Sequence, residues 1–297
     1  MNKQNWIELI HSRSAKDPVR LPADAAPRLK KLSGIRAVVF DVYGTLISSG
    51  VGDISLATEQ DRDVSLKKTL IDNQITLNEE ATVVAFDKLL HVQIKAAQSE
   101  RAGQGITYPE VEIREVWKSF ITQLEVEHLI SDSESADINT LIIDYESRIN
   151  PTQAMPGLAE TLNELNQRRL PSSIISNAQF YTPLLFDTFL GSDIDTLGFC
   201  PQCSVWSYKE REGKPSTHLY KIAAERLKEH HGIETSEVLY IGNDLRNDIW
   251  PAQLIGFKTA LFAGDALSLR RRPNDPNCEH VKADIELTDL RQIFECI

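Results

Sequence analysis

The 297-residue sequence lacks three features that would define whole classes of protein: long apolar runs, many cysteines and an excess of basic residues. Its longest apolar stretches are about the length of one buried strand, far short of the roughly 20 residues that a bilayer requires. Residues 1–31 are polar and show no apolar segment of the signal-peptide kind. We therefore expect a cytoplasmic protein without a membrane partner.

The charge balance excludes a further class of partner. A formal net charge of −11 argues against nucleic acid, because a phosphate backbone requires a basic surface. It still permits a small anionic substrate, which a few local donors and a cation can hold. Whether the chain is a monomer or a homodimer stays open.

Soft metal ligands are scarce. The four cysteines are too few for a disulfide scaffold. Cys200-Pro201-Gln202-Cys203 has the spacing of half a zinc or redox site, but no second pair accompanies it, so we interpret these as ordinary thiols. The histidines at 218, 230, 231 and 280 show no ligand spacing and are expected at the surface. Arg270-Arg271-Arg272 is interpreted as a solvated turn.

Short apolar runs recur along the chain, and each is followed by a polar turn. These runs are Arg36–Phe40, Ser173–Ile175, Val205–Trp206, Val238–Ile241 and Lys258–Phe262. Near-continuous apolar runs are typical of strands that are buried on both faces of a parallel sheet. Helical patterns at Leu158–Gln167 and Thr217–His230 lie between them. The alternation predicts an α/β fold with a doubly wound parallel sheet.

The same patterns predict the domain organisation. Residues 1–33 form an N-terminal extension that begins with a short helix, and residues 34–48 together with 150–297 form the α/β core. The inserted residues 49–149 are too many for a loop and show helical periodicity, so they are expected to form a helical cap domain. A capping box at Thr76–Glu79 predicts a helix start there, and further helices are expected from about Glu110 and around Ile138–Tyr145.

Four of the predicted strands end in polar residues. These are Asp41, Ser176, Ser207 and Asp244. In open parallel sheets, ligands bind beyond the carboxyl ends of the strands. We therefore expect the four side chains to converge at one edge of the sheet.

The residues at these strand ends resemble the four motifs of the haloacid dehalogenase superfamily. The segment from Phe40 to Leu46 is similar to the first motif, Ser176-Asn177 to the second, Lys214-Pro215 to the third, and Gly242–Asp248 to the fourth. The inserted segment falls where that family places its first type of helical cap. The resemblance implies a hydrolase with a Rossmann-like core and an active site between core and cap.

The resemblance also implies a role for each residue. Asp41 is the expected nucleophile, which forms a covalent aspartyl intermediate and so divides one difficult step into two. Thr45, Ser176 and Asn177 are expected to bind the anionic oxygens of the substrate. Lys214 would place a positive charge where negative charge develops, and Lys209 is a rival for that role.

A magnesium ion is the cofactor that the resemblance implies. Asp41, the backbone carbonyl of Tyr43 and Asp244 would supply the oxygen ligands that Mg²⁺ prefers, with Asp248 orienting water or Lys214. Asn243 stands where many relatives have an acidic residue, which leaves the ligand set open at that point. Without the resemblance, these carboxylates would read as turn or N-cap residues.

Tyr43 departs from the pattern of the family's phosphatases, which carry a second aspartate two residues after the nucleophile as general acid and base. A phenol with a pKa near 10 is a poor substitute. The aspartate–tyrosine spacing resembles the 2-haloacid dehalogenase branch, where halide leaves without a proton, but that branch needs no metal and has a less acidic fourth motif. Three hypotheses follow: a Mg²⁺-dependent hydrolase of a small phosphorylated metabolite, a metal-independent dehalogenase, and a weakly active or non-catalytic regulatory protein.

Overall fold

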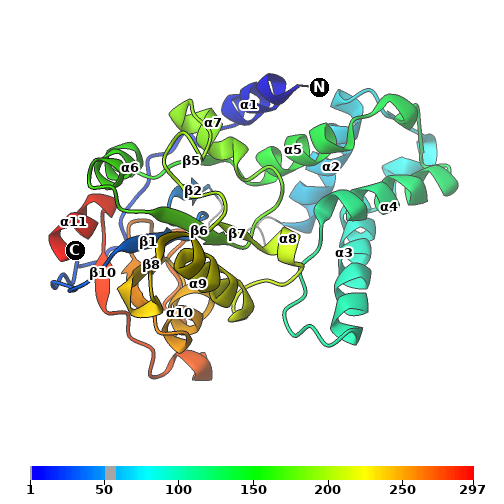
Figure 1. Ribbon diagram of the computed structural model, residues 1–297. Coiled ribbons are helices and arrows are strands. Elements are labelled where there is room, and N and C mark those ends of the chain that lie inside the picture. Colours follow the sequence, from blue (N-terminus) through cyan, green and yellow to red (C-terminus); the bar gives the residue numbers. More distant parts are fainter. Residues whose placement is uncertain (1, 51–57) are drawn as a thin grey trace.

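The computed structural model describes residues 2–50 and 58–297, and its centre is a six-stranded parallel sheet (Figure 1). Residue 1 and residues 51–57, which belong to the predicted extension and insertion, lie outside the described residues. The strand order is β10-β9-β8-β1-β6-β7. The strands are β1 (Ala37–Phe40), β6 (Ser172–Ser176), β7 (Val205–Trp206), β8 (Val238–Gly242), β9 (Lys258–Phe262) and β10 (Ile285–Leu287). The predicted doubly wound parallel sheet is confirmed, and β10 is a strand that no apolar run above predicts.

Helices cover both faces of this sheet. In the central strand β1, Val38 and Phe40 pack into one hydrophobic cluster, while Ala37 and Val39 pack into another on the opposite face. The first cluster includes residues of α1 (Lys3–Ser12), α6 (Leu158–Gln167), α7 (Leu184–Leu190) and α11 (Ile293–Cys296). The second includes residues of α9 (His218–His231) and α10 (Trp250–Leu254). All four residues of β1 are buried, because helices enclose a parallel sheet on both sides.

A second group of helices packs around a hydrophobic cluster of its own. It comprises α2 (Glu59–Asp72), α3 (Phe86–Gly103), α4 (Ile113–Val126) and α5 (Ile138–Ile149), with a small ribbon of β3 (Thr76–Leu77) and β4 (Ile130–Ser131). The indole of Trp117 lies at its centre, with ring centroids 5.9 Å from Phe120 and 5.6 Å from Tyr145. The antiparallel pair β2 (Ile47–Ser49) and β5 (Thr152–Ala154) lies where the chain leaves and re-enters the sheet domain.

One predicted helix start is wrong, and a second prediction, the helix from about Glu110, is confirmed with a slightly later start. Residues Thr76–Leu77 form strand β3, and the Asn78 side chain donates to the carbonyl of His128 instead of capping a helix. A 3₁₀ turn follows, and α3 begins only at Phe86. The helix expected from Glu110 begins at Ile113, because Glu110 pairs its backbone with Arg211 and the Glu112 side chain caps the helix.

The N-terminal extension packs against the rest of the chain. Helix α1 lies against both α7 and α5 (Figure 1). The indole Nε1 of Trp6 donates to Thr140 Oγ1 at 2.9 Å, and the backbone of Arg28 pairs with Glu286 of β10. Among the helices of the described residues, none combines the length and the apolar character that crossing a membrane would take.

The cluster around Trp117 generates a prediction on stability. Trp117 is fully buried, so Trp117→Ala removes a large apolar side chain and leaves a cavity. We expect a loss of about 3–5 kcal/mol in the free energy of unfolding, measured by urea denaturation. Val92→Ala on the exposed face of α3 is the matched control and should change it by less than about 0.5 kcal/mol. Equal effects of the two substitutions would contradict the assignment of Trp117 to a packed core.

Candidate active site

The predicted strand-end residues meet at the carboxyl edge of the sheet. Asp41 follows β1, Ser176 is the last residue of β6, and Asp244 follows β8. The side chain of Asp41 is buried, and the Ser176 hydroxyl donates to its Oδ1 at 2.9 Å. Strand β1 pairs in parallel with β6 on one side and with β8 on the other, and the pairing with β6 places the side chains of Asp41 and Ser176 next to each other.

Lys214 joins two acidic side chains at this edge. Its ammonium nitrogen lies 2.6 Å from Asp41 Oδ1 and 2.6 Å from Asp248 Oδ1. Burial by itself would lower the pKa of Lys214, but the carboxylates of Asp248 and Asp41 outweigh it and raise that pKa. The ammonium therefore stays charged. The rival Lys209 is exposed and lies over the ring of Tyr208, away from Asp41.

Asp248 is held on a π-helical turn, Leu245–Ile249, that directly follows Asp244. Its Oδ1 accepts from the Tyr240 hydroxyl at 2.9 Å, and its Oδ2 accepts from the backbone N–H of Asp244 at 2.9 Å. Burial raises the pKa of the Asp248 carboxyl, and the Lys214 ammonium opposes that shift. These contacts hold Asp248 against the Lys214 ammonium and the backbone of Asp244.

Three further predicted residues lie near Asp41 or Lys214, but their side chains make other contacts. The Asn177 side chain accepts from the backbone N–H of Lys214 at 2.7 Å, so it holds the lysine loop in place. Thr45 is fully buried, and its hydroxyl lies 3.4 Å from Asn243 Oδ1. The hydroxyl of Ser207, the first residue of α8 (Ser207–Glu210), donates to Glu110 at 2.9 Å instead of facing Asp41.

Asp244 is paired with Arg272, which corrects the interpretation of the arginine run as a solvated turn. The guanidinium donates from Nε to Asp244 Oδ1 at 3.1 Å and from Nη2 to Oδ2 at 2.6 Å. Arg246 and Asn247 also donate backbone N–H groups to the same carboxylate. A cation that binds Asp244 therefore competes with a two-pronged arginine contact.

Tyr43 points its hydroxyl at Thr182 Oγ1, 3.0 Å away. Burial raises its pKa further above the ordinary value of a phenol. The side chain therefore remains protonated and cannot exchange a proton at neutral pH. It lines the cavity without supplying acid–base chemistry.

A cavity of about 430 Å³ opens above Asp41. Asp41, Lys214 and Asp244 contribute from the edge of the sheet, and Glu110 and Glu146 contribute from the helical side. Burial raises the pKa of Glu146 to about 7, although a hydrogen bond with Tyr181 opposes the shift. The pKa of Glu110 is raised as well, chiefly by burial.

These two glutamates were not among the residues that the sequence predicted. Glu146 occupies a position on α5 that follows Ile142 by four residues, on a helix whose residues are mostly buried. A carboxylate at such a position is a signal that sequence reasoning can use, because buried acids are rare without a partner or a function. Glu110 carries no comparable signal, because it lies in an extended segment before α4.

The donor atoms around the cavity fit a hard divalent cation in kind. Asp41 and Asp244 offer carboxylate oxygens, and Tyr43 offers a backbone carbonyl. The two hydrogen bonds that the structure shows for the Asp41 carboxylate both go to Oδ1. Asp244 would have to exchange its Arg272 contact for the cation.

Comparison with known proteins agrees with this arrangement. A family model for haloacid dehalogenase-like hydrolases matches residues 35–256. The phospholysine phosphohistidine inorganic pyrophosphate phosphatase of Homo sapiens is 24% identical over 285 residues, which cover 92% of this chain and 97% of that protein. The protein of the same name from Rattus norvegicus is 23% identical, with 90% and 96% covered.

Solved structures of the same fold include a 2-haloacid dehalogenase and a phosphatase. The dehalogenase, from Pseudomonas syringae pv. Tomato, has a TM-score of 0.54 at 17% identity, with 88% of this chain and 97% of that chain covered. The phosphatase of the haloacid dehalogenase family from Thermococcus onnurineus has a TM-score of 0.50 at 16% identity, with 88% and 97% covered. At these identities the likeness shows the fold alone.

The family match includes the strand ends that carry Asp41, Ser176 and Asp244, together with the loop of Lys214. The motifs, the sheet topology and the family match therefore agree. The chain belongs to the haloacid dehalogenase-like hydrolases.

Proposed function

We propose that this hydrolase is a Mg²⁺-dependent phosphatase that acts on a small phosphorylated metabolite through Asp41 as nucleophile. The observation that carries the proposal is the buried Lys214, which joins Asp41 and Asp248 at the floor of a cavity that also contains Asp244. The Lys214 ammonium places a positive charge beside the Asp41 carboxylate, where a phosphoryl group would lie. The relatives from Homo sapiens and Rattus norvegicus are named as phosphatases, which supports the same reaction class.

In the proposed reaction, an oxygen of Asp41 attacks phosphorus while the bond from phosphorus to the leaving group breaks. Lys214 offsets the negative charge that gathers on the transferring group, and Ser176 holds the attacking carboxylate in position. Water then attacks the aspartyl phosphate, which releases inorganic phosphate and restores Asp41. Mg²⁺, held by Asp41, the Tyr43 carbonyl and Asp244, would reduce the repulsion between carboxylate and phosphate.

The proton for the leaving group is assigned to Glu146, because Tyr43 cannot give it. Glu146 reaches the same cavity from α5, and its pKa of about 7 lies near the working range of a general acid. A leaving group that is itself a weak base would depend less on protonation by a general acid. Inorganic pyrophosphate, which appears in the name of the curated relatives, has phosphate as its leaving group.

The domain assignment belongs to the same proposal. Residues 34–48 and 150–297 form the catalytic core, residues 49–149 form a cap, and movement of the cap gates access to the cavity. Helix α5, which carries Glu146, would then bring the acid to the substrate on closing. Thr45 and Asn177 stay predictions as substrate ligands.

A metal-independent 2-haloacid dehalogenase is the second candidate. Tyr43 favours it, because a halide leaves without a proton and needs no acid at that position. The carboxylates of Asp244 and Asp248 favour the phosphatase.

The nucleophile assignment predicts the behaviour of Asp41→Asn. We expect phosphate release to fall by roughly 10³-fold or more, because an amide cannot form the covalent intermediate. Beryllium fluoride with Mg²⁺ should form an adduct with the natural protein, seen by fluorine NMR, and none with the variant. Asp195→Asn, at an exposed loop position, is the control and should keep both properties. Full activity in Asp41→Asn would rule out the mechanism.

Metal dependence separates the two candidates. Phosphate release should stop in EDTA and return with Mg²⁺, and 2-chloropropionate should yield no chloride. Arg272→Ala removes the guanidinium that contacts both oxygens of Asp244, so it should lower the Mg²⁺ concentration needed for half-maximal activity. Chloride release in EDTA would instead favour the dehalogenase.

The assignment of Glu146 predicts a pH profile. A general acid must be protonated, so kcat/KM for an alkyl phosphate should fall as the pH rises above about 7. Glu146→Gln should remove this limb and reduce the rate by roughly 10²-fold or more, while a nitrophenyl phosphate with its weakly basic leaving group changes little. Glu110→Gln is the matched control. If Glu110→Gln flattens the profile and Glu146→Gln does not, the acid is misassigned.

A further inference from the structure

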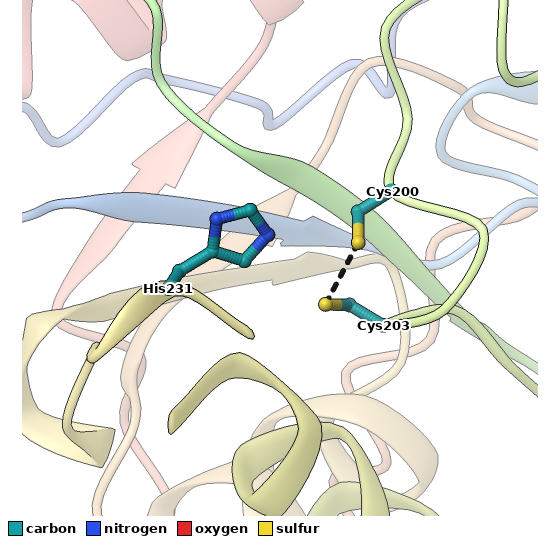
Figure 2. A group of neighbouring side chains, drawn as sticks. All are labelled: Cys200, Cys203 and His231. Carbon is teal, nitrogen blue, oxygen red and sulfur yellow. Dashed lines mark hydrogen bonds between the residues drawn. The ribbon is translucent and has the colours of Figure 1, made fainter. Parts of the chain in front are cut away.

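The fold brings a histidine to the Cys200–Cys203 pair, which the sequence alone left as two ordinary thiols. His231 is the last residue of α9, and Figure 2 shows its imidazole ring turned toward the two sulfur atoms. The three side chains offer two sulfur atoms and one ring nitrogen as ligands, and these three atoms all lie within 4.8 Å of one another. The expectation that His231 lies at the surface is confirmed, because the residue is exposed. The expectation that it has no ligand partners is wrong, because the two cysteines lie within reach of its ring.

We propose that Cys200, Cys203 and His231 form a binding site for a zinc ion, with water as the fourth ligand. Two thiolates and an imidazole are the ligand types that zinc selects, whereas the oxygen ligands around Asp41 suit Mg²⁺. The two sites would therefore take different metals. This proposal is independent of the proposed function.

The three ligand atoms lie close to the separations that a zinc ion requires, so only small side-chain movements would be needed to bind it. A tetrahedral zinc ion with ordinary bond lengths separates its ligand atoms by roughly 3.5–3.8 Å. The two sulfur atoms are 2.8 Å apart, and the widest separation within the group is at most 4.8 Å. A shift of about 1 Å in the side chains of Cys200 and His231, both of which reach the surface, would satisfy the ion.

The turn that carries the two cysteines is fixed from both sides. The backbone N–H of Cys200 donates to Ser172 of β6 at 2.7 Å, and the Ser204 hydroxyl donates to the Cys200 carbonyl at 2.9 Å. From α9, Arg226 donates to the carbonyl of Ser204 at 3.1 Å. Two of the three ligands are thus held in a turn that already packs against the helix of the third, which reduces the cost of ordering the site on binding.

A redox role fits the surroundings less well. Thiols that exchange disulfides are activated at helix N-termini and need access for an attacking partner. Cys203 is fully buried, and the pair lies in a turn before strand β7 instead of at the start of a helix. The imidazole of His231 lies beside both sulfur atoms, as a third ligand of a metal site would.

The position of the site indicates a structural role. The backbone N–H of Cys200 donates a hydrogen bond to the carbonyl of Ser172, the first residue of β6. Ser176, at the other end of the same strand, contacts Asp41. The zinc site therefore lies at the edge of the sheet opposite the catalytic edge. A bound ion would tie the turn before β7 to the end of α9.

The test is metal binding by the full-length protein in the presence of a phosphine reductant. Co²⁺ is titrated as a spectroscopic probe, and Zn²⁺ is then added to displace it. We expect one equivalent of Co²⁺ to produce thiolate-to-cobalt charge-transfer absorption that Zn²⁺ abolishes. Cys203→Ser should remove this absorption, and His231→Ala, at an exposed helix end, should weaken binding by at least about tenfold.

His230→Ala and Cys278→Ser are the matched controls, because they remove a neighbouring imidazole and a separate buried thiol. Both should bind as the natural protein does. Circular dichroism of each variant separates a lost ligand from a lost fold, and His231→Ala carries the test if Cys203→Ser does not fold. The proposal is overturned if the reduced protein gives no charge-transfer absorption, if His231→Ala binds as tightly as His230→Ala, or if Cys200 and Cys203 stay joined as a disulfide in the reductant.

Discussion

The rest of the site depends on one buried ammonium group. Without Lys214, the carboxylates of Asp41 and Asp248 would lie close together in a buried setting with no positive charge between them, where like charges repel strongly. The Lys214 ammonium offsets the negative charge of both carboxylates at once. Lys214 comes from a loop, whereas Asp41 follows β1 and Asp248 lies on the turn after β8. The two ion pairs therefore also hold that loop against the edge of the sheet.

The fold was largely predictable because a parallel sheet that is buried on both faces leaves a simple trace in the sequence. The runs around β1, β6, β8 and β9 were recognisable because their residues have no solvent face on which to be polar. The capping box at Thr76–Glu79 misled because strand pairing with β4 captured the same backbone groups. Local signals fail where a distant segment offers the backbone a better partner.

Some residues of the candidate site could also be predicted from the sequence, and others could not. Asp41, Ser176 and Asp244 could be placed because each lies at or just after the end of a strand, and the carboxyl ends of parallel strands meet at one edge of the sheet. Arg272 and His231 could not, because they meet their partners across long stretches of chain and no local pattern records those meetings. Glu146 left only one sequence signal, an acidic residue on a helix whose residues are mostly buried. The Arg272 contact matters most for the chemistry, since it places a permanent positive charge on an expected metal ligand and makes metal affinity a competition.

The N-terminal helix has a mechanical consequence. Helix α1 touches α7 beside the sheet and α5 beyond the cavity, and the contacts of Trp6 with Thr140 and of Arg13 with Asp144 bind it to α5. Helix α1 thus bridges these two helices. A movement that carries α5 away from α7 must therefore break the contacts of α1 with one of these two helices, so the N-terminal helix resists widening of the cavity from the side of α5.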